Sequence, residues 1–148
     1  MKIIVTGGLG FIGSNFIRHM ITAYSGYRII NIDKCTYSGN AENLKDVEVS
    51  PRYKWLRADI CDREKVFSCV RGADVIVHFA AETHVDRSIL EPSAFVRTNV
   101  LGTQVLLEAA RQCKVSKFVH VSTDEVYGSK ESGESLESDL LLPNSPYA

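Results

Sequence analysis

The sequence predicts an α/β fold in which a single parallel sheet is covered by helices on both faces. Two patterns lead to this prediction. Short apolar runs alternate along the chain with segments of helical periodicity, and these runs are continuous rather than alternating, as in strands buried on both faces. The composition is that of a folded domain, since 45% of the 148 residues are hydrophobic and 24% are charged. We therefore expect a doubly wound domain of three layers.

The predicted strands are short runs rich in apolar residues. The first consists mainly of β-branched residues and ends in glycines, and the second ends in an acid. Their length, about five or six residues, is typical of strands in globular proteins. In chain order the predicted strands are residues 2–6, 28–33, 53–58, 74–79 and 117–121.

Three longer segments are the predicted helices. Residues 11–24 carry apolar side chains at helical spacing. A second helix is expected to follow Asp62, whose side chain suits an N-cap, and to run to about Val70. The third and longest covers residues 92–112, with its proline near the first turn, where proline is tolerated best.

The composition also excludes several classes of protein. With 17 Lys and Arg against 18 Asp and Glu, the net charge is −1, whereas a nucleic-acid-binding domain is usually basic. The apolar runs are shorter than the roughly 20 residues of a membrane span, and residues 1–7 turn to glycine too early for a signal peptide. The four cysteines lack a C-x-x-C pair, which favours reduced, mostly buried thiols and no metal site. We expect a cytoplasmic protein without nucleic-acid or membrane partners.

Three glycines connect the first strand to the first helix. Gly7, Gly10 and Gly13 allow a tight turn, a close approach of backbone to a pyrophosphate, and close packing of helix on sheet. Asp33 closes the second strand 20 residues after Gly13, where an acid hydrogen-bonds the adenosine ribose. Its carboxylate repels a 2′-phosphate, so NAD is favoured over NADP, although Lys34 opposes that preference. A tight turn with a capping or surface aspartate is the alternative interpretation.

Residues 6–13, Thr-Gly-Gly-Leu-Gly-Phe-Ile-Gly, resemble the extended short-chain dehydrogenase/reductase family, which has a Rossmann-type fold. In that family Asp59-Ile60 matches an adenine-contacting pair, residues 79–81 match a loop under the cofactor, and Thr98-Asn99 lies in the helix where the family places a supporting asparagine. Taken alone, Asp59 also fits a capping or turn residue, and residues 79–81 also fit a packing segment. The resemblance implies a NAD site made of Gly7, Gly10, Phe11, Ile12, Gly13, Asp33, Lys34, Thr36, Asp59, Ile60, Phe79, Ala80, Ala81 and Thr98. These residues are called the cofactor set below.

Two adjacent acids follow the fifth predicted strand. Asp124 and Glu125 come shortly after its carboxyl end, where parallel sheets place their ligands. Burial and mutual repulsion can keep one of two such acids protonated and the other ionised, as acid–base chemistry requires. The same residues also fit a helix N-terminus, with Thr123 as cap and the acids complementing the dipole. The residues themselves leave both interpretations open.

Longer motifs are similar to those of the dTDP-glucose 4,6-dehydratase family, and the similarity covers essentially the whole chain. They are Asp-Lys-Cys-Thr-Tyr-Ser-Gly-Asn at 33–40, Ala-Ala-Glu-Thr-His-Val-Asp-Arg-Ser at 80–88 and Thr-Asp-Glu-Val-Tyr-Gly at 123–128. The resemblance implies dehydration of dTDP-glucose to dTDP-4-keto-6-deoxyglucose and water, for deoxysugar biosynthesis. Transient oxidation at C4 by NAD precedes the loss of water.

The resemblance also implies a role for each catalytic residue. Tyr147 takes the O4 proton while C4 is oxidised, Glu125 takes the C5 proton, and Asp124 protonates the departing 6-hydroxyl. Thr123 hydrogen-bonds O4, and Thr83 contacts the substrate in place of the family's serine. The predicted catalytic residues are therefore Thr123, Asp124, Glu125 and Tyr147. The predicted substrate-binding residues are Thr83, Thr123, Asp124 and Glu125.

The sequence leaves two alternatives open. Another nucleotide-sugar enzyme of the same fold, an epimerase or decarboxylase, shares the cofactor motifs, and a non-catalytic NAD-binding module needs only those motifs. The resemblance implies a homodimer for the full-length protein. It also implies that residues 1–148 form a NAD-binding domain truncated just after the catalytic Tyr147, without the C-terminal half of the sheet, the substrate domain or the family's lysine four residues on. We expect this chain by itself to be inactive or weakly active.

Overall fold

The computed structural model describes residues 1–130 and 132–148 and has a single five-stranded parallel sheet at its centre. The strand order is β3-β2-β1-β4-β5, so the chain runs outward from β1 to one edge and then returns to build the other side. The strands are β1 (Lys2–Thr6), β2 (Arg28–Asp33), β3 (Tyr53–Arg57), β4 (Val75–His78) and β5 (Lys117–His120). The predicted strands are confirmed, with ends that differ by one residue at β3, β4 and β5.

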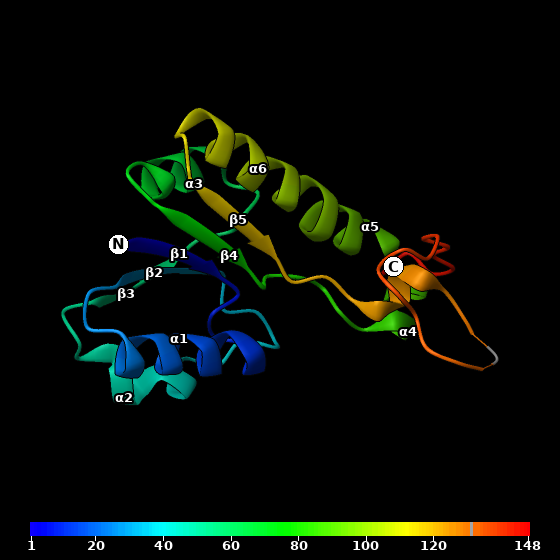
Figure 1. Cartoon of the computed structure of the whole chain (residues 1–148), viewed down its shortest axis with the longest axis horizontal. Coiled ribbons are helices and arrows are strands. Elements are labelled where there is room, and N and C mark those ends of the chain that lie inside the picture. Colours follow the sequence, from blue (N-terminus) through cyan, green and yellow to red (C-terminus); the bar gives the residue numbers. More distant parts are fainter. Residues whose placement is uncertain (131) are drawn as a thin grey trace.

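Helices cover both faces of the sheet, as predicted (Figure 1). One face carries α1 (Phe11–Ala23) and the short α2 (Lys45–Glu48), and the other carries α3 (Arg63–Val70) and α6 (Thr103–Gln112). Successive residues of β1 point to opposite faces. The side chains of Ile3 and Val5 therefore belong to the core under α1, and that of Ile4 belongs to the core under α3 and α6.

Caps and turns follow the local sequence. The Asp62 side chain caps α3 by accepting a hydrogen bond from the Lys65 amide at 3.2 Å, as predicted. Residues 40–48, for which no helix was predicted, form the 3-10 turn η1 (Ala41–Leu44) and α2, with the side chain of Asn40 as cap. A further helix that was not predicted, α4 (Val85–Leu90), follows the loop after β4.

The long predicted helix at 92–112 is continuous but not uniform. It consists of α5 (Pro92–Phe95), a π-helical segment η2 (Val96–Gly102) and α6. Two contacts lie in the π segment: the Asn99 side chain bonds the backbone of Glu82, and Gly102 packs so closely on Ile60 that a Cβ would lie 2.5 Å from its terminal methyl. Such segments are frequent at functional sites.

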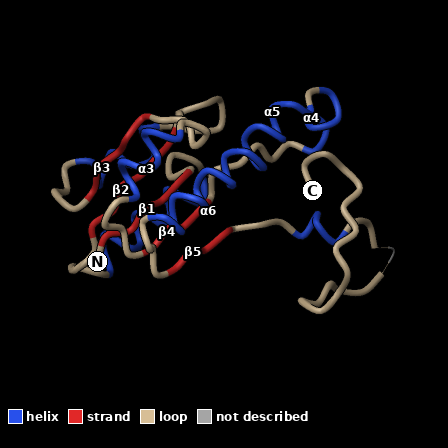
Figure 2. The backbone as a smooth tube through the Cα atoms, turned by 90° about the horizontal axis from the view of Figure 1, so that it is seen from above, coloured by secondary structure: helices blue, strands red, loops and turns tan. Residues whose placement is uncertain are grey.

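The residues after β5 leave the sheet and form a separate lobe with α4. Figure 2 shows this segment turning away from the strand ends and passing near α4 and α5. It contains the 3-10 turn η3 (Asp124–Tyr127) and is tied to itself by the Leu142 amide, which donates to the Val126 carbonyl at 2.9 Å. Among residues 1–130 and 132–148, no helix is both long and apolar enough to cross a bilayer.

All four cysteines are free thiols, as predicted, but the expectation that they are mostly buried is wrong. Each is only half-buried. Cys35, Cys69 and Cys113 pack at the margins of the two cores rather than inside them. Cys61 lies beside the helical run, where its Sγ donates to the Arg97 carbonyl at 3.2 Å.

The packing of α1 on the β1 turn gives a first testable prediction. A Cβ at Gly13 would overlap the Gly7 carbonyl oxygen, whereas one at Gly26 would meet nothing within 4 Å. We expect Gly13→Ala to lower the free energy of unfolding by about 1–3 kcal/mol through overpacking, and the control Gly26→Ala to change it by less than about 0.5 kcal/mol. Urea unfolding measures both, and equal effects would contradict the packing.

Candidate functional site

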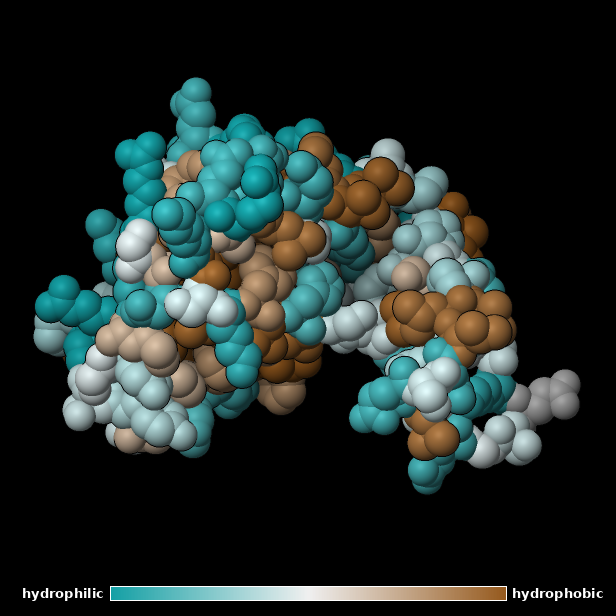
Figure 3. All heavy atoms as spheres, turned by 45° about the horizontal axis from the view of Figure 1, so that its top comes forward, coloured by the Kyte–Doolittle hydropathy of each residue, from teal (hydrophilic) through white to brown (hydrophobic). Residues whose placement is uncertain are grey.

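A cavity of about 430 Å³ opens at the carboxyl ends of the strands, where such sheets place their ligands. Figure 3 shows the surface hollowed between the sheet with its helices and the smaller lobe, on which apolar side chains gather. Every residue of the cofactor set lines the cavity, together with Thr83 and Tyr147. Residues of the lining that were not predicted are Ile32, Ser38, Gly39, Ala58, Glu82, Val121 and Ser122. Most of them adjoin predicted residues in the same loops, which is the signal that could have found them.

The glycine turn forms the floor of the cavity. Gly7 has a φ of +70°, and a Cβ there would lie 2.6 Å from the Ala80 amide nitrogen, so the turn rests directly against the loop after β4. At Gly10 a Cβ would meet only the Gly7 carbonyl oxygen, at 3.4 Å, which leaves that side of the backbone open. Within the described residues, no side chain caps α1 and no acid lies in its first turn. Its first N–H groups and its dipole therefore suit an anion.

The acid predicted to bind ribose is held in place by the backbone. The Asp33 Oδ2 accepts from the Leu9 amide at 2.9 Å, and its Oδ1 accepts from the Cys35 amide at 2.7 Å. The second bond follows from the turn at Cys35, whose φ is +57°. Both bonds orient the carboxylate in the cavity wall.

The neighbouring Lys34 is engaged by another acid of the wall. Its Nζ donates to the Asp59 Oδ2 at 2.8 Å, while the Asp59 Oδ1 accepts from the Cys61 amide at 2.9 Å. Burial tends to raise the pKa of Asp59, but the hydrogen bonds from Lys34 and from Cys61 outweigh it, so that the pKa is lowered. Lys34 is therefore paired within the wall, which weakens its opposition to a preference for NAD over NADP.

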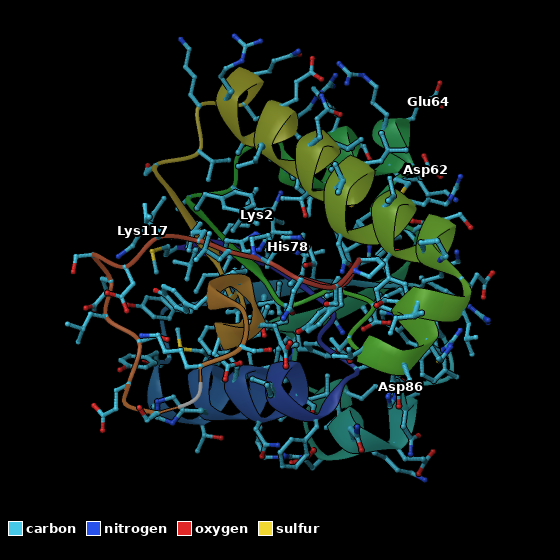
Figure 4. All side chains as sticks on the ribbon, turned by 90° about the vertical axis from the view of Figure 1, so that its right-hand side faces the viewer. Lys2, Asp62, Glu64, His78, Asp86 and Lys117 are labelled. Atoms are coloured by element: carbon cyan, nitrogen blue, oxygen red, sulfur yellow. The ribbon has the colours of Figure 1, made fainter. Side chains whose placement is uncertain are left out.

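A buried histidine supports the cavity from below. The Nδ1 of His78 lies 2.6 Å from the Thr6 Oγ1, and its Nε2 lies 2.9 Å from the Thr103 Oγ1. Thr6 Oγ1 also accepts from the Ala80 amide at 3.3 Å, so the histidine is linked to the loop that touches the glycine turn. Figure 4 shows His78 among the strands, between the helical layers. Burial, and to a lesser degree the neighbouring His120, lower the pKa of His78 to about 4.

The structure divides the predicted catalytic set. Tyr147 lines the cavity, with its ring edge-on to Phe95 at 6.4 Å between ring centres. Thr123, Asp124 and Glu125 lie outside the lining, in and just before η3. The Thr123 Oγ1 accepts from the Glu125 amide at 3.2 Å and donates to the Asp124 Oδ1 at 3.3 Å. The capping arrangement that the sequence left open is thus present; because the cap is threonine, neither carboxylate is used for capping, although the Asp124 Oδ1 accepts the Thr123 hydroxyl.

In the part of the chain that the structure describes, His, Cys, Asp and Glu side chains form no cluster of three or more that could hold a metal ion.

Comparison with known proteins gives concordant matches. The family model described as GDP-mannose 4,6 dehydratase matches residues 4–148. A dTDP-glucose 4,6-dehydratase of Streptomyces niveus is 53% identical over the whole chain, which covers 45% of that protein. The structure of the dTDP-glucose 4,6-dehydratase DesIV from Streptomyces venezuelae, with NAD and TYD bound, has a TM-score of 0.95 and 51% identity over 99% of this chain and 47% of its own. A UDP-glucuronic acid 4-epimerase from Bacillus cereus, with NAD, has a TM-score of 0.90 and 36% identity over 99% of this chain and 48% of its own.

The chain spans about half the length of the curated relatives it matches. The segment matched by the family model, residues 4–148, includes the glycine turn, the acid pair and Tyr147.

The His78 network gives a second prediction. The folded protein holds His78 neutral with a pKa of about 4, whereas an unfolded histidine titrates near 6.5. The unfolded state therefore binds more protons between these values, and stability falls as the pH is lowered from 6.5 to 4, by up to about 1.4 kcal/mol per pH unit. We expect His78→Gln to lose this part of the slope and His19→Gln, on α1, to keep it. Urea unfolding measured across this pH range would contradict the assignment if the His78→Gln slope equalled the wild-type slope.

Proposed function

The chain belongs to the GDP-mannose 4,6 dehydratase family, and from that premise we propose that the whole protein is a NAD-dependent hydro-lyase that removes water from a nucleotide-activated hexose. The proposed reaction converts dTDP-glucose to dTDP-4-keto-6-deoxyglucose for deoxysugar biosynthesis. One observation carries the proposal: a single cavity at the carboxyl ends of the strands gathers the whole cofactor set, Thr83 and Tyr147. The similarity to dTDP-glucose 4,6-dehydratases over the full chain supports the choice of substrate.

The residues present fit NAD. The open backbone at Gly10 and the uncapped start of α1 suit its pyrophosphate. Asp33 suits the hydroxyls of its adenosine ribose, and Asp59 and Ile60 suit its adenine. When bound, NAD would supply a temporary hydride acceptor: the hydride taken from C4 would return to C6 while C5 regains a proton, so that C4 is oxidised, C6 is reduced and only water is lost.

The protein's own side chains move the protons. Tyr147 takes the proton of the sugar O4, and Thr123 donates a hydrogen bond to the same oxygen. Oxidation at C4 acidifies the C5 proton, which Glu125 removes, and Asp124 protonates the leaving 6-hydroxyl. Thr83 positions the sugar from the opposite loop. Thr123 follows the lining residue Ser122 directly, so the acid pair belongs to the segment that enters the cavity wall.

An epimerase is the second candidate, because 4-epimerases share the fold at 29–36% identity. The residue that favours dehydration is Asp124. Only the loss of the 6-hydroxyl needs a general acid where Asp124 lies, whereas inversion of configuration at C4 does not.

The assembly and location belong to the same proposal. We propose a homodimer for the whole protein, located in the cytoplasm, without nucleic-acid or membrane partners. Apolar side chains that are 45–62% exposed along η2 and α6 support an interface there. They are Val96, Val100, Leu101 and Leu107. The free thiols support a reducing compartment.

The acid role of Asp124 gives a third prediction. We expect the complete protein, incubated with dTDP-glucose and NAD⁺, to form a product with the alkali-induced absorbance of a 4-ketosugar. Asp124→Asn should lower kcat by about 10²–10⁴-fold, the usual contribution of a general acid, without weakening NAD binding. Glu137→Gln, an exposed change in the loop after η3, is the matched control. Absence of the ketosugar in the wild-type assay would exclude the dehydratase function.

The ribose acid gives a fourth prediction. Asp33→Asn removes the negative charge that repels a 2′-phosphate while keeping a side-chain oxygen for the Leu9 or Cys35 amide. We expect the Kd for NAD to rise about tenfold or more and the ratio of NADP to NAD affinity to increase. Asp46→Asn serves as the control, because Asp46 on α2 forms an exposed ion pair with Arg18 on α1. An unchanged NADP/NAD ratio, measured by calorimetry, would remove Asp33 from the specificity argument.

A further inference from the structure

Two loops of the cavity wall meet above the end of β1. β2 and β4 flank β1 in the sheet. The end of β2 and the loop after it line the cavity with Asp33, Lys34, Thr36, Ser38 and Gly39, and the loop after β4 lines it with Phe79 to Thr83. The hydroxyl of Tyr37 donates to the Glu82 Oε2 at 3.0 Å. This hydrogen bond joins the loop that follows the ribose acid to the loop that carries Thr83.

Glu82 is held at its backbone as well as at its side chain. Its amide donates to the Asn99 Oδ1 and its carbonyl accepts from the Asn99 Nδ2, each at 2.9 Å. Its carboxylate, 16% exposed, also lies 3.9 Å from the Arg87 Nη1. Glu82 is therefore fixed to the π-helical segment η2 and to α4, and provides a firm acceptor on the cavity wall.

Tyr37 is held on its other side by packing. The Arg87 guanidinium lies 4.4 Å from the centre of the Tyr37 ring, over its face, where a cation is attracted by the ring. Arg87 is in turn 3.9 Å from the Glu91 carboxylate. Burial, followed by the hydrogen bond to Glu82, raises the pKa of Tyr37, so the hydroxyl keeps its proton near neutrality and acts as the donor.

We propose that Glu82 is a positioning residue which, by accepting the Tyr37 hydroxyl, ties loop 34–39 to loop 79–83 at the cavity wall and retains the bound dinucleotide. This inference rests on the proposed function, because the ligand of the cavity is taken to be NAD. A dinucleotide bound against both loops would be released faster when the two loops are no longer tied together. Loss of the bridge therefore speeds release, without removing any residue of the cofactor set.

The experiment measures release of NADH from the complete protein, followed by its fluorescence after excess NAD⁺ is added. Tyr37→Phe removes only the donor. We expect release to become about three- to tenfold faster, the range of one net hydrogen bond, with an unchanged thermal midpoint. Tyr24→Phe is the matched control, since Tyr24 is also exposed and stacks on Tyr27 outside the cavity.

A double-mutant cycle separates the bridge from independent effects of the two residues. In the Glu82→Ala background the effect of Tyr37→Phe should vanish. A Tyr37→Phe release rate equal to that of the wild type, or an effect that persists undiminished in Glu82→Ala, would overturn the inference.

A readout without ligand keeps the two proposals distinguishable. In the ligand-free protein, Tyr37→Phe should speed hydrogen exchange in loop 34–39, whereas Tyr24→Phe should leave that loop unchanged. Faster exchange together with a wild-type protein that fails to bind NADH would overturn the proposed function and leave the bridge in place. NADH binding with unchanged exchange and unchanged release would overturn the bridge and leave the proposed function in place.

Discussion

The site depends on one steric constraint: the turn after β1 has no room for side chains where it meets the sheet and the loop after β4. A Cβ at Gly7 would meet the Ala80 backbone, and one at Gly13 would overlap the Gly7 carbonyl. Gly8 has the same restriction against the side chain of Asn31, whose Oδ1 accepts from the Gly8 amide at 3.0 Å. Because the turn is closely packed from three sides, the start of α1 is presented to the cavity in a fixed orientation.

The other polar contacts build on that floor. Asn31 is itself bonded to the buried Tyr53 hydroxyl at 3.1 Å, so the turn is anchored through β2 to β3. On the opposite side, Thr6 and His78 hold the Ala80 amide that abuts Gly7. A cavity wall supported from both halves of the sheet can orient a ligand at little cost in loop ordering, which is the physical meaning of a preorganised site.

Much of this could be predicted from the sequence because it rests on local patterns. Each strand, the Asp62 cap and the glycine turn depend on residues that lie only a few positions apart in the sequence. The parts that were missed depend on contacts between distant residues: the Tyr37–Glu82 bond spans 45 positions, and the backbone of Glu82, which is the partner of the supporting Asn99, lies 17 positions from it. The two interpretations of Asp124 and Glu125 stayed open for the same reason, since local capping and catalysis use the same residue types.

We propose that the cavity at the carboxyl ends of the strands holds NAD by its pyrophosphate at the start of α1. An NMR titration of the protein with NAD⁺ tests it most directly, because backbone amide signals report the binding position residue by residue. We expect saturable shifts concentrated at Gly10, Phe11 and Ile12, with further shifts at Asp33 and Ala80. Absence of saturable shifts, or shifts confined to another face of the molecule, would contradict the claim.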